Sequence, residues 1–457
     1  MAKRILITGG AGFIGSHLAD QLLAHGYEVR ALDNLTPQVH GNADAPLSTD
    51  DHRDRPAYLA GEVELIAGDI CDPAVVRRAL DGVDAVYHLA AAVGVGQSMY
   101  QIAHYTRTNN LGTAVLLEAL TRHPVDRLIV ASSMSIYGEG RYCRALEAGP
   151  APEQETRRCT PPMAAGSVVR PLARMQAGDW EVRDIDGAPL LPLPTPESHA
   201  SATGIQSVYA LSKFDQERLC LVTGRAYGIP TVALRFFNTY GPRQALGNPY
   251  TGVLAIFAAR LLGGQPPLIN EDGLQQRDFV HVGDVARACR LALEVPRERL
   301  LQEPDPVFNV GSGVPRTILE IAQRLSAVLG RQIAPLVTGT YRMGDIRHCF
   351  ADISKAQAVL GYQPRMPFDE GLRDLARWLE QQRVEVVGGT SSVVDPGELA
   401  RSELAKRGLA IAAPAASRQP APLAAPVAAD TATAGELTLD ALATPEHAPD
   451  ALAQVVR

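Results

Sequence analysis

Cysteine is scarce in this chain, and the few cysteines that occur are scattered. Six lie among 457 residues without a repeated spacing. Disulfide frameworks and zinc knuckles both repeat short cysteine spacings, so neither is indicated here. The pattern therefore favours reduced thiols in a cytoplasmic protein.

Long apolar runs and a strong excess of one charge are also missing. No apolar segment is long enough to span a bilayer. The opening sequence MAKRILITGG leads directly into a strand pattern rather than a signal peptide. The formal net charge of -7 argues against a nucleic-acid or anionic-membrane partner. These absences predict a cytoplasmic protein that binds neither nucleic acid nor membrane.

Short apolar runs alternate with helical patterns through the first half of the chain. RILIT, EVRAL, VELIAG, AVYHLAA and RLIVASS predict buried strands, with amphipathic helices between them. This alternation predicts an α/β fold with a doubly wound parallel Rossmann sheet in residues 1–253. The more mixed pattern of residues 254–383 predicts a smaller α/β lobe that binds substrate and shares elements with the first domain.

Three segments do not fit a compact core. Residues 37–60 form a polar excursion, and residues 139–205 form a Pro- and Arg-rich insert that we interpret as a lid or interface element. Residues 384–457 are rich in Ala and Pro, which predicts a disordered tail. The insert contains Cys143, Cys159 and His199. A structural zinc needs four ligands, so no bound metal is predicted.

A glycine-rich turn follows the first predicted strand and opens a helix. Gly9, Gly12 and Gly15 let the backbone approach a pyrophosphate at the helix N-terminus. Asp33, at the end of the next strand, lies where an acid binds a ribose 2′-OH and repels a 2′-phosphate. The pattern therefore predicts NAD as the cofactor. The other predicted cofactor contacts are Phe13, Ile14, Asn34, Asp69, Ile70, Leu89, Ala90, Ala91 and Asn109. Asp69 has the alternative role of a helix N-cap.

A YxxxK pair supplies the candidate acid–base chemistry. Tyr209 and Lys213 lie one helical turn apart and share a face. A phenol has an ordinary pKa of roughly 10, and an adjacent ammonium group favours its phenolate. Tyr209 can then exchange a proton with a substrate hydroxyl while NAD takes or gives a hydride, so Tyr209 and Lys213 also count as cofactor contacts. Ser133, at a strand end, completes the candidate catalytic set.

Together these motifs resemble the extended short-chain dehydrogenase/reductases that act as nucleotide-sugar epimerases and dehydratases. Further matching motifs are ALRFFNTYGPRQ (233–244), RDFVHVGDVA (277–286), FNVGSG (308–313) and GDIRHCFADISKAQAVLGYQP (344–364). The resemblance implies a nucleotide-sugar substrate whose diphosphate contacts Asn238 and is clamped by Arg277 and Arg347. Surface ion pairs are the alternative role for the two arginines.

The two positions after Ser133 distinguish between reactions in this family. Sugar dehydratases resemble one another in carrying Asp-Glu there, because elimination needs an acid and a base. This chain carries Met134 and Ser135, of which Ser135 is predicted to line the substrate site. Simple pocket packing is the alternative for both side chains. A 4-epimerase needs neither acid, so the set predicts 4-epimerisation.

Within the family, AAAVGVGQSMYQIAHYTRTNNLGT and SSMSIYGEGRY resemble the dTDP-L-rhamnose 4-epimerases. The resemblance implies interconversion of dTDP-L-rhamnose and dTDP-6-deoxy-L-talose. The alternatives are a UDP-hexose or UDP-uronate 4-epimerase, then a dehydratase or decarboxylase, then a non-catalytic NAD-binding scaffold.

Two predicted helices carry more apolar side chains than one face can bury. They are the helix after Asn109 and the helix that contains Tyr209. The family resemblance implies that these helices pack as a four-helix bundle across a two-fold axis, which predicts a homodimer. Alternatively, the insert 139–205 covers this surface and the chain is a monomer.

Overall fold

The computed structural model describes residues 2–40, 55–144, 162–164, 168, 170–245, 252–342, 344–386 and 402–411. These residues belong to one compact unit, Met1–Pro422. The second unit, Leu423–Arg457, lies outside the described residues, as do parts of the 37–60 excursion and of the insert 139–205.

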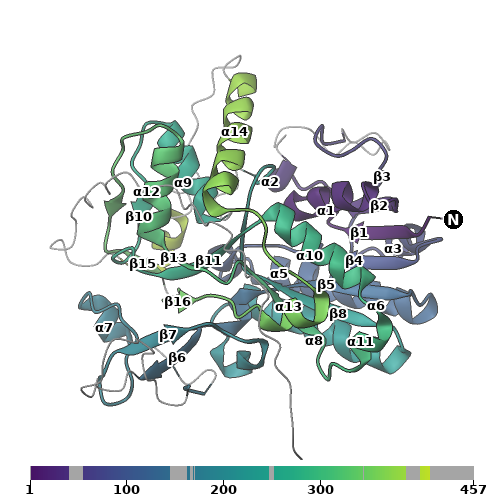
Figure 1. Ribbon diagram of the computed structural model, residues 1–457, viewed down its shortest axis with the longest axis horizontal. Helices are drawn as coiled ribbons and strands as arrows, with labels where there is room; N and C mark the ends of the chain where they lie inside the picture. Colours follow the sequence, from purple (N-terminus) through teal and green to yellow (C-terminus); the bar gives the residue numbers. More distant parts are fainter. Residues whose placement is uncertain are drawn as a thin grey trace, which may run out of the picture. The chain divides into compact units, whose positions relative to one another are not determined.

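A seven-stranded parallel sheet forms the centre of the fold (Figure 1). Its strand order is β12-β8-β5-β4-β1-β2-β3, and every neighbouring pair is parallel. The strands are β1 (Arg4–Thr8), β2 (Glu28–Asp33), β3 (Glu64–Ala67), β4 (Ala85–His88), β5 (Arg127–Ser133), β8 (Thr231–Phe236) and β12 (Val307–Val310). The predicted doubly wound Rossmann sheet is confirmed.

Helices cover both faces of the sheet because successive strand residues point to opposite sides. Ile5 and Ile7 of β1 belong to a core shared with α1 and α10, whereas Leu6 belongs to a core shared with α3, α6 and α8. The helices are α1 (Phe13–Leu23), α3 (Pro73–Leu80), α6 (Gly112–Arg122), α8 (Val208–Tyr227) and α10 (Val282–Glu294). This three-layer arrangement brings the ends of β1, β4 and β5 to one edge, where the predicted site residues lie.

A smaller lobe with its own hydrophobic core stands beside the sheet (Figure 1). Its helices are α9 (Val253–Leu262), α12 (Ile318–Val328) and α14 (Phe368–Val386). Its strands are β9 (Asn238–Tyr240), β10 (Leu268–Ile269), β11 (Gln276–His281), β13 (Pro315–Thr317), β14 (Leu336–Val337) and β16 (His348–Cys349). β12 and α10 also lie within residues 254–383, but they belong to the layers of the central sheet.

Short elements connect these layers. They are α2 (Pro37–His40), α4 (Val95–Ser98), α5 (Ile102–Tyr105), a π-helix (Thr106–Leu111), α11 (Arg297–Leu301), α13 (Ser354–Leu360) and three 3₁₀ turns (Met134–Tyr137, Glu197–His199, Ala202–Gly204). The described part of the insert 139–205 contains β6 (Arg141–Arg144), α7 (Leu172–Gln176) and β7 (Leu190–Leu193), and β6 pairs antiparallel with β7.

One cysteine departs from the expectation of reduced thiols. Cys71, Cys220, Cys289 and Cys349 are free, but Cys143 of β6 is disulfide-bonded. The expectation is therefore wrong at Cys143. A single disulfide needs no repeated cysteine spacing, so the scattered pattern could not reveal it.

Structured residues also occur inside the segment expected to be a disordered tail. Residues 402–406 are helical, and β17 (Ala410–Ile411) pairs antiparallel with β15 (Tyr341–Arg342). Leu404 is buried, and the Arg407 guanidinium lies 4.2 Å from the ring centroid of Tyr100. Contacts with both the smaller lobe and the segment after β4 order these residues, and composition alone does not reveal such contacts.

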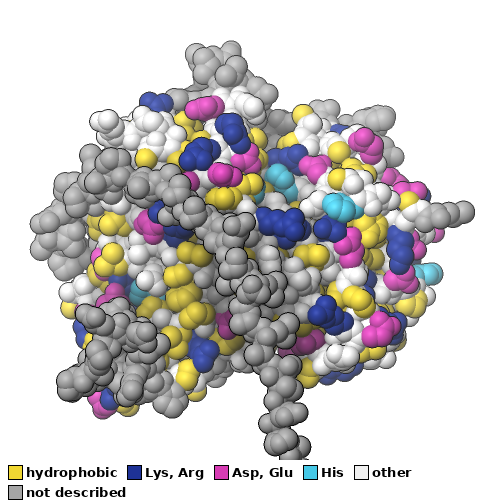
Figure 2. Space-filling view, viewed as in Figure 1, with side chains coloured by type: hydrophobic (Ala, Val, Ile, Leu, Met, Phe, Trp, Pro, Cys, Tyr) yellow, Lys and Arg dark blue, Asp and Glu magenta, His cyan; other side chains and the backbone are white. Residues whose placement is uncertain are grey.

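The described surface shows no concentration of positive charge on the face drawn in Figure 2, where basic and acidic side chains are interspersed. In addition, none of the helices in the described ranges is long and apolar enough to cross a membrane.

Candidate active site

The glycine-rich turn after β1 has the tight geometry that a pyrophosphate cradle requires. Gly9 adopts φ +72°, which glycine tolerates best. A Cβ on Gly15 would lie 2.2 Å from the Gly9 carbonyl oxygen, so a side chain there would close the turn. Gly12 is the N-cap of α1, whose free backbone N–H groups suit an anion. Phe13 and Ile14 follow in the first helical turn and are half-buried.

The turn also depends on Gly10, which is not predicted from the sequence. A Cβ on Gly10 would lie 2.5 Å from the Cβ of Ala31 on β2. The requirement comes from the approach of a neighbouring strand, which motif spacing alone does not show.

Asp33 lies at the end of β2 beside the glycine-rich turn. Its carboxylate accepts hydrogen bonds from the backbone N–H groups of Ala11 (3.0 Å) and Leu35 (2.9 Å). His40 approaches the same carboxylate at 3.5 Å. The side chain of Asn34 turns instead to Thr36, where its Oδ1 accepts a 2.6 Å hydrogen bond. Asp33 is thus fixed next to the turn, in the position predicted for a ribose contact.

Asp69 and Ile70 follow β3, and Asp69 is not the helix N-cap that was its alternative role. The N-cap of α3 is Asp72, whose side chain accepts hydrogen bonds from Ala74 and Val75. Asp69 instead accepts from the backbone N–H of Cys71 at 2.8 Å. The role of Asp69 in cofactor binding stays a prediction.

Asn109 joins the end of β4 to the helix that carries the catalytic pair. Its Oδ1 accepts a hydrogen bond from the Ala92 backbone (2.7 Å), and its Nδ2 donates to Ser212 of α8 (2.9 Å). Asn109 is fully buried within the π-helix Thr106–Leu111. Leu89, Ala90 and Ala91 follow β4 directly and precede Ala92 in the sequence. The backbone of Leu89 and Ala90 also borders Gly9.

Ser133, Ser135 and Tyr209 meet at the end of β5. Ser135 donates a hydrogen bond to Ser133 Oγ (2.9 Å), and Tyr209 of α8 is hydrogen-bonded to Ser133. Burial raises the pKa of Tyr209, and the hydrogen bond from Ser133 opposes that rise. Met134 packs in a buried cluster with Tyr137 and Phe237, as its packing alternative expects. The structure therefore assembles the predicted phenol and hydroxyl pair.

Lys213 is buried one turn along α8 from Tyr209. Burial lowers the pKa of its ammonium to about 8. Its Nζ donates a 2.7 Å hydrogen bond to Gln216 Oε1, and Gln216 in turn contacts His88 and Thr113. Gln216 is not predicted from the sequence, and His88 is predicted only as part of the HLAA segment (88–91) near the dinucleotide, not as a support for Lys213. The sequence pattern indicates only that both residues lie on buried faces, of α8 and β4, and many core residues share this property.

Asn238 and Arg277 lie on the paired strands β9 and β11. Asn238 Oδ1 is buried without a hydrogen-bond partner among the described residues, so it can accept one from a ligand. Arg277 donates to the backbone carbonyls of Arg347 and Gln276 (2.9 Å each) and of Ile346. A diphosphate role for either residue stays a prediction.

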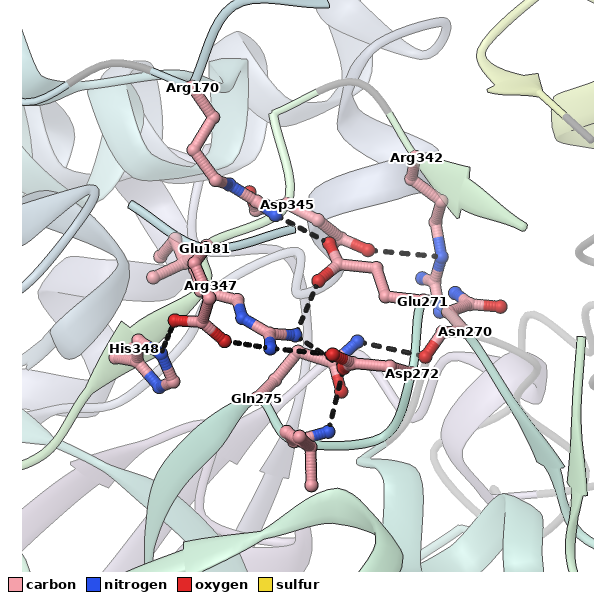
Figure 3. A network of polar contacts seen from close by, with 12 residues as sticks. Arg170, Glu181, Asn270, Glu271, Asp272, Gln275, Arg342, Asp345, Arg347 and His348 are labelled. Atoms are coloured by element: carbon pink, nitrogen blue, oxygen red, sulfur yellow. Dashed lines mark hydrogen bonds and ion pairs between the residues drawn. The ribbon is translucent and has the colours of Figure 1, made fainter. Parts of the chain in front are cut away.

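Arg347 lies within a buried network of ion pairs, and its diphosphate role stays a prediction. Its fully buried guanidinium donates to Glu271 (2.9 Å), Asp272 (2.6 Å) and Glu181 (2.5 Å), as Figure 3 shows. Its backbone N–H donates to Glu139 at 2.8 Å. The alternative of ion pairing describes these contacts, although they are buried rather than on the surface.

The carboxylates around Arg347 come from segments distant in sequence. Arg170 joins the same network, with ion pairs to Glu139 (3.2 Å) and Glu271 (2.8 Å). Glu181 also approaches His348 at 3.4 Å (Figure 3). Arg170 and Glu181 belong to the insert 139–205, so this network anchors the described part of the insert to β16 and to the loop after β10. In the described ranges, no group of three or more His, Cys, Asp or Glu side chains could hold a metal ion.

The parallel sheet, the glycine cradle and the Ser133–Tyr209–Lys213 set are those of the short-chain dehydrogenase/reductase class. The model of the NAD dependent epimerase/dehydratase family matches residues 5–161 and 188–311, and the chain belongs to this family. A dTDP-L-rhamnose 4-epimerase from Burkholderia thailandensis is 33% identical over 384 residues, covering 83% of this chain and 96% of the relative.

Solved structures of nucleotide-sugar 4-epimerases share the fold. A Thermotoga maritima UDP-glucose 4-epimerase with UDP-glucose has a TM-score of 0.62 and 28% identity, covering 83% of this chain and 99% of its own. A Bacillus cereus UDP-glucuronic acid 4-epimerase with UDP-glucuronic acid and NAD has a TM-score of 0.58 and the same identity and coverage. The cofactor of this family is NAD, and the cradle formed by Gly9, Gly15 and Asp33 fits it.

Proposed function

We propose that this chain is an NAD-dependent nucleotide-sugar 4-epimerase that interconverts dTDP-L-rhamnose and dTDP-6-deoxy-L-talose. The observation that carries the proposal is the hydrogen bond between Ser133 and Tyr209, with Lys213 buried one helical turn along α8. The two residues after Ser133 are Met134 and Ser135 instead of two acids. The 33% identical dTDP-L-rhamnose 4-epimerase supports this choice of substrate.

Each residue of the set has a defined task in the proposed reaction. The Tyr209 phenolate takes the proton from the C4 hydroxyl and later returns it. Ser133 donates a hydrogen bond toward the same oxygen, and the Lys213 ammonium stabilises the phenolate. NAD, when bound, supplies the hydride acceptor and donor for C4. Without acids at positions 134 and 135, the set does not remove a second hydroxyl, so the 4-keto sugar returns to the alcohol with either configuration.

A panel of three substrates tests the choice of sugar. Purified protein without added cofactor is incubated with dTDP-L-rhamnose, UDP-glucose or UDP-glucuronate, and the C4 configuration is followed by NMR. We expect the C4 epimer of dTDP-L-rhamnose to form fastest. Turnover of either UDP-sugar, with no turnover of dTDP-L-rhamnose, would favour the alternative of a UDP-hexose or UDP-uronate 4-epimerase. The UDP-glucose and UDP-glucuronic acid 4-epimerases whose structures this chain resembles are enzymes of that kind.

We further infer that the chain forms a homodimer through α6 and α8. Leu211, Leu219 and Val222 of α8 remain exposed, with Val222 at 64%, so the described part of the insert does not cover them. Leu219 and Val222 line a shallow hollow with Asn110, Asp215 and Arg218. These exposed apolar side chains on α8 favour burial against a second copy.

A charge in this hollow should separate the two copies. Val222→Arg is expected to convert a dimer to a monomer in sedimentation at micromolar concentration, because a buried unpaired charge costs several kcal/mol. Leu301→Arg on α11 is the matched control, since Leu301 is more exposed, at 71%, and lies outside α6 and α8. Wild-type protein that sediments as a single chain would contradict the dimer.

A further inference from the structure

Lys213 rests on a buried chain of neutral hydrogen-bonding groups that the catalytic set does not include. The chain consists of Gln216 of α8, Thr113 of α6, His88 of β4 and Thr8 of β1, and all four are fully buried. Lys213 Nζ donates to Gln216 Oε1 at 2.7 Å. Of these four residues, Gln216 is the one that contacts Lys213 directly.

The hydrogen bonds of Thr113 determine which way the Gln216 amide faces. The Thr113 hydroxyl donates to the Asn109 carbonyl, so its oxygen is left to accept. Gln216 Nε2 lies 2.9 Å from that oxygen and donates to it. An amide with its nitrogen fixed on Thr113 must present its oxygen to Lys213.

His88 completes this arrangement as a neutral imidazole. Burial lowers the pKa of His88 to about 3, with Lys213 contributing in the same direction. Nδ1 lies 2.8 Å from Thr8 Oγ1, and Nε2 lies 2.8 Å from Thr113 Oγ1. Because the Thr113 proton is committed to the Asn109 carbonyl, His88 Nε2 carries the imidazole proton and donates to Thr113, and Nδ1 accepts from the Thr8 hydroxyl.

Lys213 is therefore the one formal charge within this chain of five residues. The other titratable groups around it are Tyr209, Glu217 and Cys220 on α8 and His88 on β4. Glu217 is committed to Arg235 at 2.8 Å, and burial raises the pKa of Cys220 to about 12, which keeps that thiol neutral. No acid in the described surroundings offsets the ammonium at hydrogen-bond distance.

From this geometry we propose that Gln216, oriented by Thr113 and His88, is a positioning residue that holds the Lys213 ammonium while leaving its charge available to Tyr209. The amide oxygen satisfies one N–H of the ammonium without adding a negative charge. A carboxylate in that place would hold the ammonium equally well but would weaken its effect on the phenol. The role in turnover rests on the proposed function, whereas the effect on Lys213 does not.

Gln216→Glu and Gln216→Met separate the two parts of the proposal. In Gln216→Glu the acceptor remains but the charge is offset, so the Tyr209 pKa rises. The acid limb of the kcat/KM profile should move up by about one pH unit, with turnover recovering at high pH. In Gln216→Met the acceptor is lost, and turnover should fall by about 10- to 100-fold at every pH. Gln357→Glu, an exposed site on α13, is the matched control and should match the wild type.

Stability measurements provide a readout that needs no substrate. Folded Lys213 has a pKa of about 8 against an ordinary 10.5. Between those two values the unfolded chain binds the extra proton, so this group makes the unfolding free energy rise with pH. Gln216→Glu raises the folded pKa, so the NAD-bound variant should lose this rise between pH 8 and 10.

The outcomes are distinguishable from failure of the proposed function. If no nucleotide sugar turns over but the stability difference appears, the proposed function is wrong and the contact with Lys213 stands. Unchanged pH profiles and unchanged stability slopes in both Gln216 variants would overturn the positioning role. A loss of turnover that only follows the loss of stability in both variants would overturn it as well.

Discussion

Replacing Tyr209 with phenylalanine is expected to lower kcat by about a thousandfold while leaving the fold and the bound NAD in place. The substitution removes the group that exchanges a proton with the C4 hydroxyl. The ring remains to pack edge-on against Tyr105, whose centroid lies 6.3 Å away. Turnover, NAD content and the melting temperature should be measured on the same preparation.

Tyr87→Phe gives a matched control for the Tyr209 variant. The Tyr87 hydroxyl donates a buried 2.9 Å hydrogen bond to the Cys289 carbonyl, away from the site. Its loss should cost about 1 kcal/mol of stability with little change in turnover. Turnover that persists in Tyr209→Phe would favour a binding scaffold, or a different acid–base group, over the proposed mechanism.

Replacing Arg347 with methionine is expected to reduce the free energy of unfolding by about 3 kcal/mol or more. Methionine fills part of the buried volume but leaves the carboxylates of Glu271, Asp272 and Glu181 without the guanidinium they share. Glu271 then keeps its ion pair with Arg170, which also pairs with Glu139. Denaturant unfolding of wild type and variant measures the loss.

The pH dependence of this loss has a definite sign. Burial raises the pKa of Glu271, and Arg170 and Arg347 act against that rise. Without Arg347 the folded pKa rises further above the unfolded value, so the destabilisation is relieved as pH falls through that folded value. The loss should therefore be smaller at pH 5 than at pH 7.5.

Arg342→Met is the control for stability, because Arg342 is exposed and lies 3.7 Å from its partner Asp345. Its expected cost is below about 1 kcal/mol. A substrate clamp at Arg347 would behave differently from a structural hub. If Arg347→Met keeps its stability and only raises KM, the diphosphate role predicted from the sequence is correct.

The sequence predicts the part of the fold that depends on local patterns. β1, β2 and β5 coincide with RILIT, EVRAL and RLIVASS because buried parallel strands are short continuous apolar runs. β8 and β12 are not predicted as strands, although they complete the sheet. Runs of four to six residues such as VFNV are ambiguous until a neighbouring strand defines them.

In the candidate site, too, some residues are predicted from local motifs, whereas others depend on contacts between distant segments. The glycine turn, Asp33 and Tyr209 follow motif spacing, and the structure brings them to the sheet edge that the spacing implies. The environment of Arg347 does not follow from spacing, because its carboxylate partners come from residues 181, 271 and 272. The contact between Gln216 and Lys213 likewise depends on Thr113 and His88 from two other elements.

The fate of the hydrogen on C4 tests 4-epimerisation most directly. Purified protein is incubated, without added cofactor, with dTDP-L-rhamnose that carries deuterium at C4, and the product is examined by NMR. We predict an inverted C4 that keeps its deuterium, because the hydrogen leaves C4 and returns without exchange with water. An inverted C4 that carries hydrogen from the solvent, or a labelled sugar whose C4 configuration does not change, would contradict the proposed reaction.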